Sequence, residues 1–388
     1  MLSLLSAIKN NRLTVSVSVL ALAISLAACG GQQAADNTGS NGTATDTAAS
    51  TTGKLDLGGN VSLTGAGASF PAPLYASWFT DLNKKYPNLQ VNYQSVGSGA
   101  GVEQFIQGTV DFGASDVAMK DEEIQKVTRG VLLLPVTAGG IVLAYNLPDV
   151  PELNLPRAVY TDIALGKIKT WNDPKIVAAN PDAKLPNQPI TFVYRSDGSG
   201  TTGVFTKHLA AISPEWKSKI GEGKSVNWPV GVGGKGNEGV TAQIKQTQGS
   251  IGYIEYGYAK QNNISFATLE NKSGKFVKYN DESSSKTLAA IQLPENLRAF
   301  VPDPDGEESY PIVSFSWIMA YKSYPDVPKA KAMEAAIEYA LTEGQKISGE
   351  LGYIPLPQAV VEKVAAAADQ ISPDYKISVS SSGNSASK

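Results

Sequence analysis

Short apolar runs alternate along this chain with segments in which apolar residues recur every three or four positions. The runs at residues 61–64, 91–96 and 190–194 predict strands. A glycine-rich loop and then a helical pattern follow each run; behind the first loop, Trp78 and Leu82 are spaced to share one helical face. Strand, loop and helix in this repeated order predict an α/β protein with parallel sheets.

Two further apolar runs, at residues 140–145 and 312–321, enclose a long segment with strand and helix patterns of its own. We interpret them as crossovers between two interleaved lobes. One lobe would comprise residues 59–140 together with 312–376, and the other residues 141–311. The alternative is two consecutive domains with one linker, but no linker-like stretch occurs near the middle of the chain.

The N-terminal segment has the order of an export signal. Lys9 and Arg12 precede the uncharged apolar run 13–28, and Cys29 follows directly. The run contains Ser and Thr and is shorter than the about 20 apolar residues of a membrane-spanning helix. We therefore predict a signal peptide over residues 1–28 rather than a transmembrane helix.

The residues that flank the folded region have a composition unsuited to a core. Residues 29–58 consist mainly of small and polar residues, so burial cannot offset the entropy lost on ordering. We predict a flexible tether there, and a disordered tail at residues 377–388. The segment 26–30 (LAACG) resembles the lipobox of bacterial lipoproteins, which implies that Cys29 is lipidated and becomes the mature N-terminus.

Charge and length limit the possible functions. The chain has 388 residues, of which 42% are hydrophobic, enough for two lobes with cores of their own. Lys and Arg number 33 against 36 Asp and Glu, so no basic field exists for nucleic acid. The single cysteine, Cys29, excludes a disulfide within the chain.

The loops at residues 65–71, 97–101 and 195–200 are suited to an anion. Each would place backbone N–H groups at a helix N-terminus, where the helix dipole favours negative charge. The loops and the helix starts behind them also supply hydroxyl and guanidinium groups, from Ser69, Ser98, Arg195, Ser199 and Thr201. Together they predict an anion site at the carboxyl ends of the strands.

Each of these polar residues also has a purely structural interpretation. Ser69 could be a helix cap, Ser98 a solvent-facing hydroxyl, and Asp197 the centre of an Asx turn.

Asp116 could likewise be a helix cap or a surface charge. As a site residue, its carboxylate would accept a hydrogen bond only from an anion that retains a proton. Phosphate retains one near neutral pH and sulfate does not, so Asp116 would favour phosphate.

Six longer motifs carry a resemblance to a known family: residues 65–73 (GAGASFPAP), 110–116 (VDFGASD), 167–171 (KIKTW), 197–201 (DGSGT), 233–237 (GGKGN) and 251–261 (IGYIEYGYAKQ). From about residue 61 to 364 the chain resembles the phosphate-binding subunit, a substrate-binding lipoprotein, of bacterial phosphate ABC transporters. The resemblance implies a periplasmic-binding-protein-like fold of the two-crossover type, with two interleaved α/β lobes and a ligand cleft between them.

The resemblance also implies a role for each matching residue. The ligand-binding residues would be Ser69, Phe70, Ser98, Asp116, Arg195, Ser199, Gly200 and Thr201, with Asp116 as proton acceptor, Arg195 as the arginine on phosphate, and Asp197 as the acid that orients it. Two positions depart from the family: Ser69 stands where relatives have Thr, and Tyr194 where some have a second arginine.

The biological setting follows from the same resemblance. The protein would capture inorganic phosphate, as in phosphate starvation, and deliver it to ABC transporter permease subunits. It would need no cofactor or metal and would catalyse no reaction. It would be an extracytoplasmic monomer held to a membrane, at the periplasmic face or cell surface, by the lipid on Cys29.

A phosphoester hydrolase and a non-transport surface adhesin on the same fold are the alternatives. The only histidine, His208, lies seven residues beyond Thr201, about 10 Å along a helix, so it could hardly serve Ser199 as a base. We expect it to be a half-buried helix residue. Residues 231–236 match a dinucleotide-binding fingerprint, but the pattern predicts neither a clear strand before them nor a helix behind them.

Overall fold

The computed structural model describes residues 55–379. The predicted signal peptide, Cys29, most of the tether and residues 380–388 lie outside the described residues. Both ends of the described region extend slightly beyond the predicted folded part, since Leu55, Leu57 and Ile377 are buried. The described residues belong to one compact unit.

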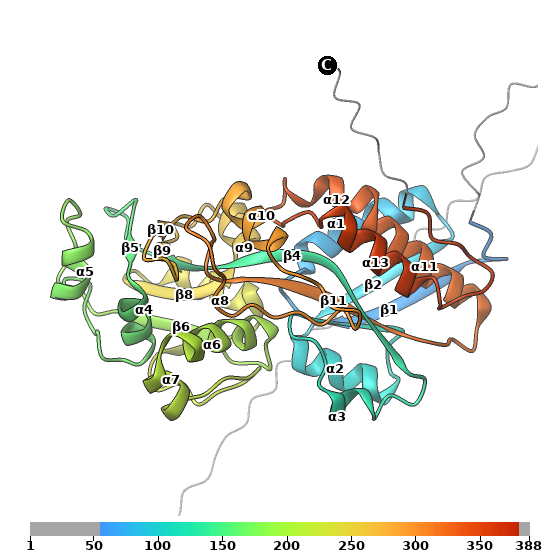
Figure 1. The fold of residues 1–388 in the computed structure, drawn as a ribbon, viewed down its shortest axis with the longest axis horizontal. Coiled ribbons are helices and arrows are strands. Elements are labelled where there is room, and N and C mark those ends of the chain that lie inside the picture. The colour runs from blue at the N-terminus through green and yellow to red at the C-terminus, as the bar shows by residue number, and fades with distance from the viewer. Residues whose placement is uncertain (1–54, 380–388) are drawn as a thin grey trace, which may run out of the picture. The chain divides into compact units, whose positions relative to one another are not determined.

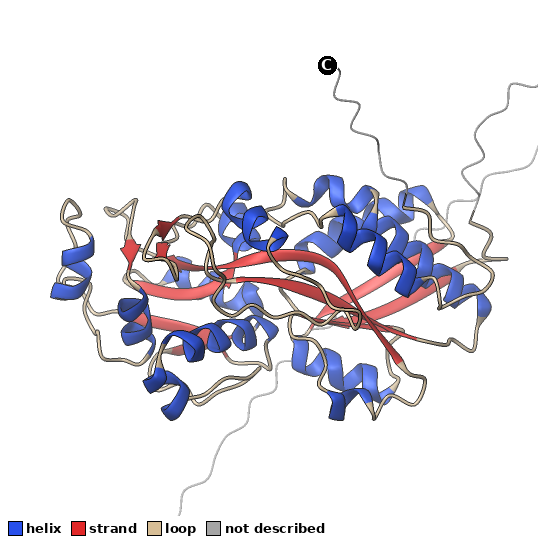
Figure 2. Ribbon diagram, viewed as in Figure 1, coloured by secondary structure: helices blue, strands red, loops and turns tan. Residues whose placement is uncertain are grey.

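One eight-stranded sheet organises the fold, in the order β2-β1-β3-β11-β4-β8-β6-β7 (Figures 1 and 2). Its strands are β1 (Val61–Gly67), β2 (Leu89–Ser95), β3 (Phe112–Ser115), β4 (Val131–Tyr145), β6 (Thr191–Arg195), β7 (Val232–Gly234), β8 (Ser250–Glu255) and β11 (Val313–Tyr321). A small second sheet has the order β10-β9-β5, formed by β5 (Asn154–Leu155), β9 (Thr268–Glu270) and β10 (Phe276–Val277).

The large sheet is mixed, which corrects the expectation of purely parallel sheets. Strands β1, β2 and β3 are parallel to one another, as are β6, β7 and β8. Between these two groups, β4 and β11 pair antiparallel with each other and with the neighbouring strand on either side. The strand–loop–helix repeats therefore predicted the parallel strands of the two outer groups. No such repeat flanks β4 and β11, so the sequence did not indicate that these two strands are antiparallel.

Strands β4 and β11 join the two parallel groups. The first part of β4 pairs with β11, and its end, from Ile141 to Tyr145, pairs with β8. All residues of both strands are buried, as expected for strands covered on both faces. They run side by side through the middle of Figure 1. This course agrees with the predicted crossovers, although the lobe boundaries stay a prediction.

Strand β4 begins at Val131, nine positions before the predicted start at residue 140. Pro135 obscured this in the sequence, because proline cannot donate to a sheet ladder. The register of β4 against β11 shifts between Ser316 and Trp317, opposite Pro135. A bulge of this kind tolerates a proline within a strand and re-aims the side chains beside it. Ser316, at the shift, belongs to the site described below.

Thirteen helices are described in residues 55–379, and they flank the large sheet (Figure 2). They are α1 (Ala72–Lys85), α2 (Ser98–Gln107), α3 (Asp121–Ile124), α4 (Arg157–Ala164), α5 (Pro174–Ala179), α6 (Gly200–Ile212), α7 (Pro214–Lys219), α8 (Gly236–Gln246), α9 (Tyr256–Gln261), α10 (Asp281–Ala289), α11 (Val327–Leu341), α12 (Glu343–Ser348) and α13 (Gln358–Ala368). None of these helices is long and apolar enough to cross a membrane.

Helix α1 shows how local sequence sets an element. Its first turn contains Pro73, which is pre-organised for that position, and its last turn contains Lys84 and Lys85, which complement the helix dipole. Trp78 and Leu82 lie on its buried face, as predicted. The indole N–H of Trp78 donates to the Gly344 carbonyl at 2.9 Å, which ties the helix to the C-terminal part of the chain.

Candidate functional site

The predicted site residues lie at the carboxyl ends of the parallel strands of both groups. Ser69, Ser98 and Asp116 follow β1, β2 and β3, while Arg195 ends β6 and Ser199 caps α6 behind it. The side chains of Ser69, Phe70, Ser98, Asp116, Arg195, Ser199 and Thr201 are all at most 4% exposed. The chain thus buries a carboxylate, a guanidinium and four hydroxyls where helix N-termini meet.

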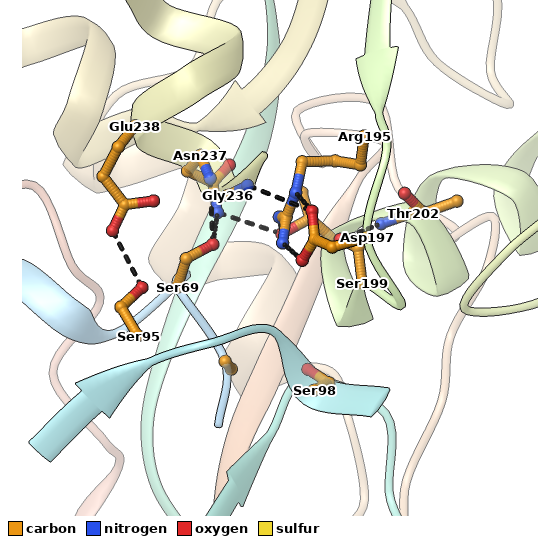
Figure 3. A network of polar contacts seen from close by, with 12 residues as sticks. Ser69, Ser95, Ser98, Arg195, Asp197, Ser199, Thr202, Gly236, Asn237 and Glu238 are labelled. Atoms are coloured by element: carbon orange, nitrogen blue, oxygen red, sulfur yellow. Dashed lines mark hydrogen bonds and ion pairs between the residues drawn. The ribbon is translucent and has the colours of Figure 1, made fainter. Parts of the chain in front are cut away.

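Arg195 is held rigidly by Asp197. The guanidinium donates from Nε and Nη2 to the two carboxylate oxygens, at 2.8 and 2.6 Å (Figure 3). Burial acts to raise the pKa of Asp197, but the hydrogen bonds and charge of Arg195 outweigh it, so this pKa is lowered. The bidentate pair fixes the plane of the guanidinium and leaves Nη1 to donate to Thr201 Oγ1 at 3.3 Å.

Ser199 and Gly200 begin α6. The Ser199 hydroxyl accepts from the Thr202 N–H at 3.0 Å, a capping bond that sets the start of the helix. The N–H groups of Gly200 and Thr201 lie in the first helical turn and have no intrahelical acceptor. Glycine is required at position 200, because a Cβ there would lie 2.4 Å from Ser98 Oγ and 2.5 Å from Asp116 Oδ2. The helix start thus lies directly against the carboxylate.

Asp116 has hydroxyl partners but no close cation. Its Oδ1 accepts from the Ser316 hydroxyl at 2.8 Å, and its backbone N–H donates to Ser98 Oγ at 3.3 Å. Burial raises the pKa of Asp116 to about 7, although the Ser316 hydroxyl, the charge of Arg195 and the Ser98 hydroxyl act to lower it. The carboxyl group therefore changes charge near neutral pH.

Ser69 and Phe70 enter the site in different ways. The Ser69 hydroxyl accepts from the backbone N–H and the side-chain amide of Asn237, at 2.9 and 3.0 Å (Figure 3). The ring of Phe70 packs edge-on against Tyr353, whose hydroxyl donates to the Phe70 carbonyl at 2.8 Å. Only the backbone of Phe70 is therefore available to a ligand.

The structure contradicts three of the alternative interpretations: Ser69 as a helix cap, Ser98 as a solvent-facing hydroxyl, and Asp116 as a cap or a surface charge. Ser69 caps no helix, since Pro71 is the N-cap of α1. Ser98 is fully buried rather than solvent-facing, and Asp197 pairs with Arg195. Asp116 is 1% exposed and lies before Lys120, the N-cap of α3, so it is neither a surface charge nor that cap.

Two polar residues of the site were given no role from the sequence. Asn237 lies in the first turn of α8, within the GGKGN motif, and Ser316 lies on β11 at the register shift. Ser316 is 200 residues away from the carboxylate that it contacts. The motif was the only local signal for Asn237, and nothing local distinguished Ser316 from other serines.

His208 corrects one expectation: it is fully buried, not half-buried. Its Nδ1 lies 2.6 Å from the Pro302 carbonyl, which can only accept, so Nδ1 carries a proton. In the neutral ring Nε2 then accepts from the Tyr160 hydroxyl, 2.8 Å away. Burial lowers the pKa of His208 to about 4, so the ring is neutral at physiological pH. Both nitrogens are engaged in the core, and neither is available as a base for Ser199.

The segment at residues 231–236 also differs from expectation. It contains a strand, β7, and leads directly into a helix, α8. Gly233 and Gly234 lie within the strand, however, and the first residue of the helix contacts the chain itself: the Gly236 N–H donates to Asp197 Oδ1 at 3.0 Å (Figure 3). This helix start therefore supports the anion site rather than a separate nucleotide site.

Comparisons with known proteins identify the family. Residues 36–343 match the model of the PBP superfamily domain. The phosphate-binding protein PstS of Haemophilus influenzae is 45% identical over 81% of this chain and 94% of its own length. The protein of the same name from Pasteurella multocida is 44% identical over 78% of this chain and 89% of its own length.

Solved structures show the same fold. A high-affinity periplasmic phosphate-binding protein, PfluDING, solved with phosphate bound, aligns with a TM-score of 0.66 at 19% identity over 79% of this chain and 93% of its own. A phosphate-binding protein from Stenotrophomonas maltophilia aligns with a TM-score of 0.64 at 17% identity, over 79% and 94%. The chain belongs to the PBP superfamily and, within it, to the family of the PstS phosphate-binding proteins.

Proposed function

We propose that this protein is an extracytoplasmic solute-binding protein that captures inorganic phosphate and delivers it to the permease of an ABC transporter. The observation that carries the proposal is the composition of the buried site. Arg195, hydroxyls and helix N-termini can donate hydrogen bonds to an oxyanion, and Asp116 can accept one from it. A protonated tetrahedral anion suits this combination, and the relatives are named for phosphate binding.

The ligand would lie between two lobes, one built from β1 to β3 and the other from β6 to β8. Three contacts support this arrangement by joining the two groups around the site. Gly99 N–H donates to the Gly198 carbonyl at 2.7 Å, Asn237 N–H to Ser69 Oγ at 2.9 Å, and Tyr258 hydroxyl to the Ser69 carbonyl at 2.7 Å. Closing of the lobes would then complete the site.

Small-angle scattering tests the closing of the lobes. Saturating phosphate should reduce the radius of gyration of phosphate-stripped protein, because donors from both lobes converge on one anion. Equal radii with and without phosphate would contradict closure, although not binding itself.

Titration calorimetry on purified, phosphate-stripped protein tests the function. Phosphate should bind at one site per chain, arsenate should compete because of its similar shape and protonation, and sulfate should produce no binding heat. A surface adhesin would give no heat with any of these anions. A phosphoester hydrolase would also release phosphate from a phosphoester, which we expect this protein not to do because His208 is engaged in the core. Melting temperature followed against phosphate concentration gives an independent readout.

The lipid anchor is a separate part of the proposal. Cys29 is the only cysteine and stands between the apolar run and the small-residue segment. Changing Cys29→Ala should move the protein from the detergent phase to the aqueous phase after phase separation, and should abolish labelling by a fatty acid. Continued labelling of the variant would disprove lipidation at this residue while leaving phosphate binding untouched.

A further inference from the structure

Asn237 lies at the centre of the site and is bonded to both sides of it. It is fully buried at the start of α8. Its side-chain amide lies 3.0 Å from Ser69 Oγ and 3.1 Å from Thr201 Oγ1, so it bridges two hydroxyls from different parts of the chain. Figure 3 shows Asn237 above Ser69, with the Arg195–Asp197 pair to their right.

The orientation of this amide is fixed by a third partner. Asn237 Oδ1 lies 3.1 Å from the backbone N of Glu255, at the end of β8. A backbone N–H can only donate, so the atom that faces it must be the amide oxygen. The NH₂ group consequently points at the two hydroxyls, and its two protons are sufficient for one hydrogen bond to each.

The acceptor capacity of both hydroxyls is then used within the protein. A hydroxyl has two acceptor lone pairs and one proton. Ser69 Oγ accepts from the backbone N–H and the side chain of Asn237. Thr201 Oγ1 accepts from Asn237 Nδ2 and from Arg195 Nη1, at 3.1 and 3.3 Å. Each hydroxyl can therefore only donate to a further partner.

We propose that Asn237 determines the direction of hydrogen bonding in the site: it holds Ser69 and Thr201 as donors to the anion and leaves Asp116 as the acceptor for the anion's proton. This inference rests on the proposed phosphate site. Asn237 is a positioning residue that need not touch the ligand, and it would keep Ser69 and Thr201 from accepting a proton of the ligand. A second proton on the ligand would find no acceptor at these two hydroxyls.

Several titratable groups surround Asn237 and the two hydroxyls, and they are the same in parent and variant: Asp116, Arg195, Asp197, Glu238, Tyr253, Glu255 and Tyr258. Arg195 and Asp197 are paired. Burial raises the pKa of Glu255 and that of Tyr258 well above their ordinary values. The inference concerns the protons of the ligand and of Asp116, which faces the start of α6.

The test is the number of protons released on binding phosphate at about pH 6. It is measured by calorimetry in two buffers that differ in ionisation enthalpy. The parent should release protons, because free phosphate and Asp116 both carry protons at this pH and neither Ser69 nor Thr201 can accept one from the ligand. In Asn237→Ala one lone pair on each hydroxyl becomes free to accept the ligand's second proton. We expect release to fall by up to one proton, with an about tenfold loss of affinity from the missing hydrogen bonds.

Asn180→Ala provides the matched control. Asn180 is also a buried asparagine with hydrogen bonds to the backbone, at the C-cap of α5, where it bonds to Asn154 and Ile176. This variant should lower the melting temperature without changing proton release. Asn237→Leu, which fills similar volume without an amide, replaces Asn237→Ala if the latter does not fold.

The outcomes distinguish a failure of the inference about Asn237 from a failure of the proposed function. Reduced proton release in either Asn237 variant, with parental release in Asn180→Ala, supports the inference. Parental release in a folded Asn237 variant of lower affinity overturns it and reduces Asn237 to a packing role. If the parent itself gives no heat with phosphate, the proposed function fails, independently of Asn237.

Discussion

Two aspartates of the site, the buried Asp116 and the partly buried Asp197, lie in contrasting environments. Asp197 receives both arms of the Arg195 guanidinium and a backbone N–H, and its pKa is lowered. The Asp116 carboxylate receives hydrogen bonds only from hydroxyl groups, and burial raises its pKa to about 7. The carboxylate of Asp197 has a counter-ion within the protein, whereas that of Asp116 has none among the described residues and, in the proposed function, accepts a proton from the ligand. Structural and ligand-binding acids can thus be distinguished by whether the protein supplies a counter-ion.

Removal of Arg195 should have the largest effect. Arg195→Ala deprives the site of its guanidinium and leaves the partly buried Asp197 without its partner. Losing a charge-assisted contact of this kind costs a few kcal/mol, so affinity for phosphate should fall by about a hundredfold or more. Calorimetry on the stripped variant measures the change.

Arg157→Ala is the matched control for this substitution. Arg157 makes a comparable bidentate pair with Asp303, at 2.9 and 2.7 Å, and neither residue belongs to the site. Affinity should remain parental in this control. A change of less than threefold in Arg195→Ala would show that its guanidinium does not reach the ligand.

The aspartates should respond in opposite directions when each is neutralised. The folded-state pKa of Asp116 lies above its unfolded value, so its contribution to stability is present below about pH 4 and is lost as pH rises through about 7. At pH 8, Asp116→Asn should therefore raise the free energy of unfolding of the stripped protein by a few kcal/mol, and the gain should shrink toward pH 4.

Asp197→Asn should destabilise the protein at pH 8. The fold stabilises the ionised carboxylate of Asp197, and the substitution leaves Arg195 without its partner. Chemical denaturation of both variants at two pH values checks this pair of predictions. Destabilisation by both substitutions to the same extent at pH 8 would remove the distinction between the two acids.

The ion pair between Lys224 and Glu123 should have the smallest effect. It joins the two proposed lobes at 3.0 Å, and the backbone carbonyl of Lys224 also accepts from the Ser199 N–H at 2.8 Å. Partly exposed pairs contribute about 1 kcal/mol or less, so Lys224→Ala should speed phosphate dissociation by no more than about fivefold.

Salt provides a check on this effect. At high ionic strength the ion pair is screened, so phosphate should dissociate from the parent and from Lys224→Ala at the same rate. Lys219→Ala breaks a pair with Glu215 that does not join the lobes, and it should leave dissociation unchanged. Equal acceleration in both variants would show that the Lys224 pair does not hold the lobes together.

Local sequence predicted the parts of this molecule that depend on local geometry. Glycine loops behind apolar runs identified Ser69, Ser98 and Arg195, because a strand, a tight turn and a helix start are encoded within a few residues. Strand β4 was placed too late because Pro135 interrupted its pattern.

Contacts that depend on strand order were not predictable in this way. Asn237 is 168 residues from Ser69, and Ser316 is 200 residues from Asp116. Which serine on β11 faces the carboxylate depends on a register shift that only the assembled sheet reveals. The environment of Asp116 depends on such a long-range neighbour, whereas Asp197 pairs with Arg195, two residues away.

Calorimetry of phosphate and sulfate binding to the parent and to Asp116→Asn at about pH 8 shows whether the Asp116 carboxylate makes the site selective. Sulfate brings no proton to the ionised Asp116, and two facing acceptors in a buried site cost several kcal/mol. The parent should therefore bind phosphate and reject sulfate. In the variant the amide can donate to a sulfate oxygen, so sulfate should bind measurably while phosphate affinity stays within several-fold of the parent. If Asp116→Asn rejects sulfate as completely as the parent does, the carboxylate is not the selective element of the site.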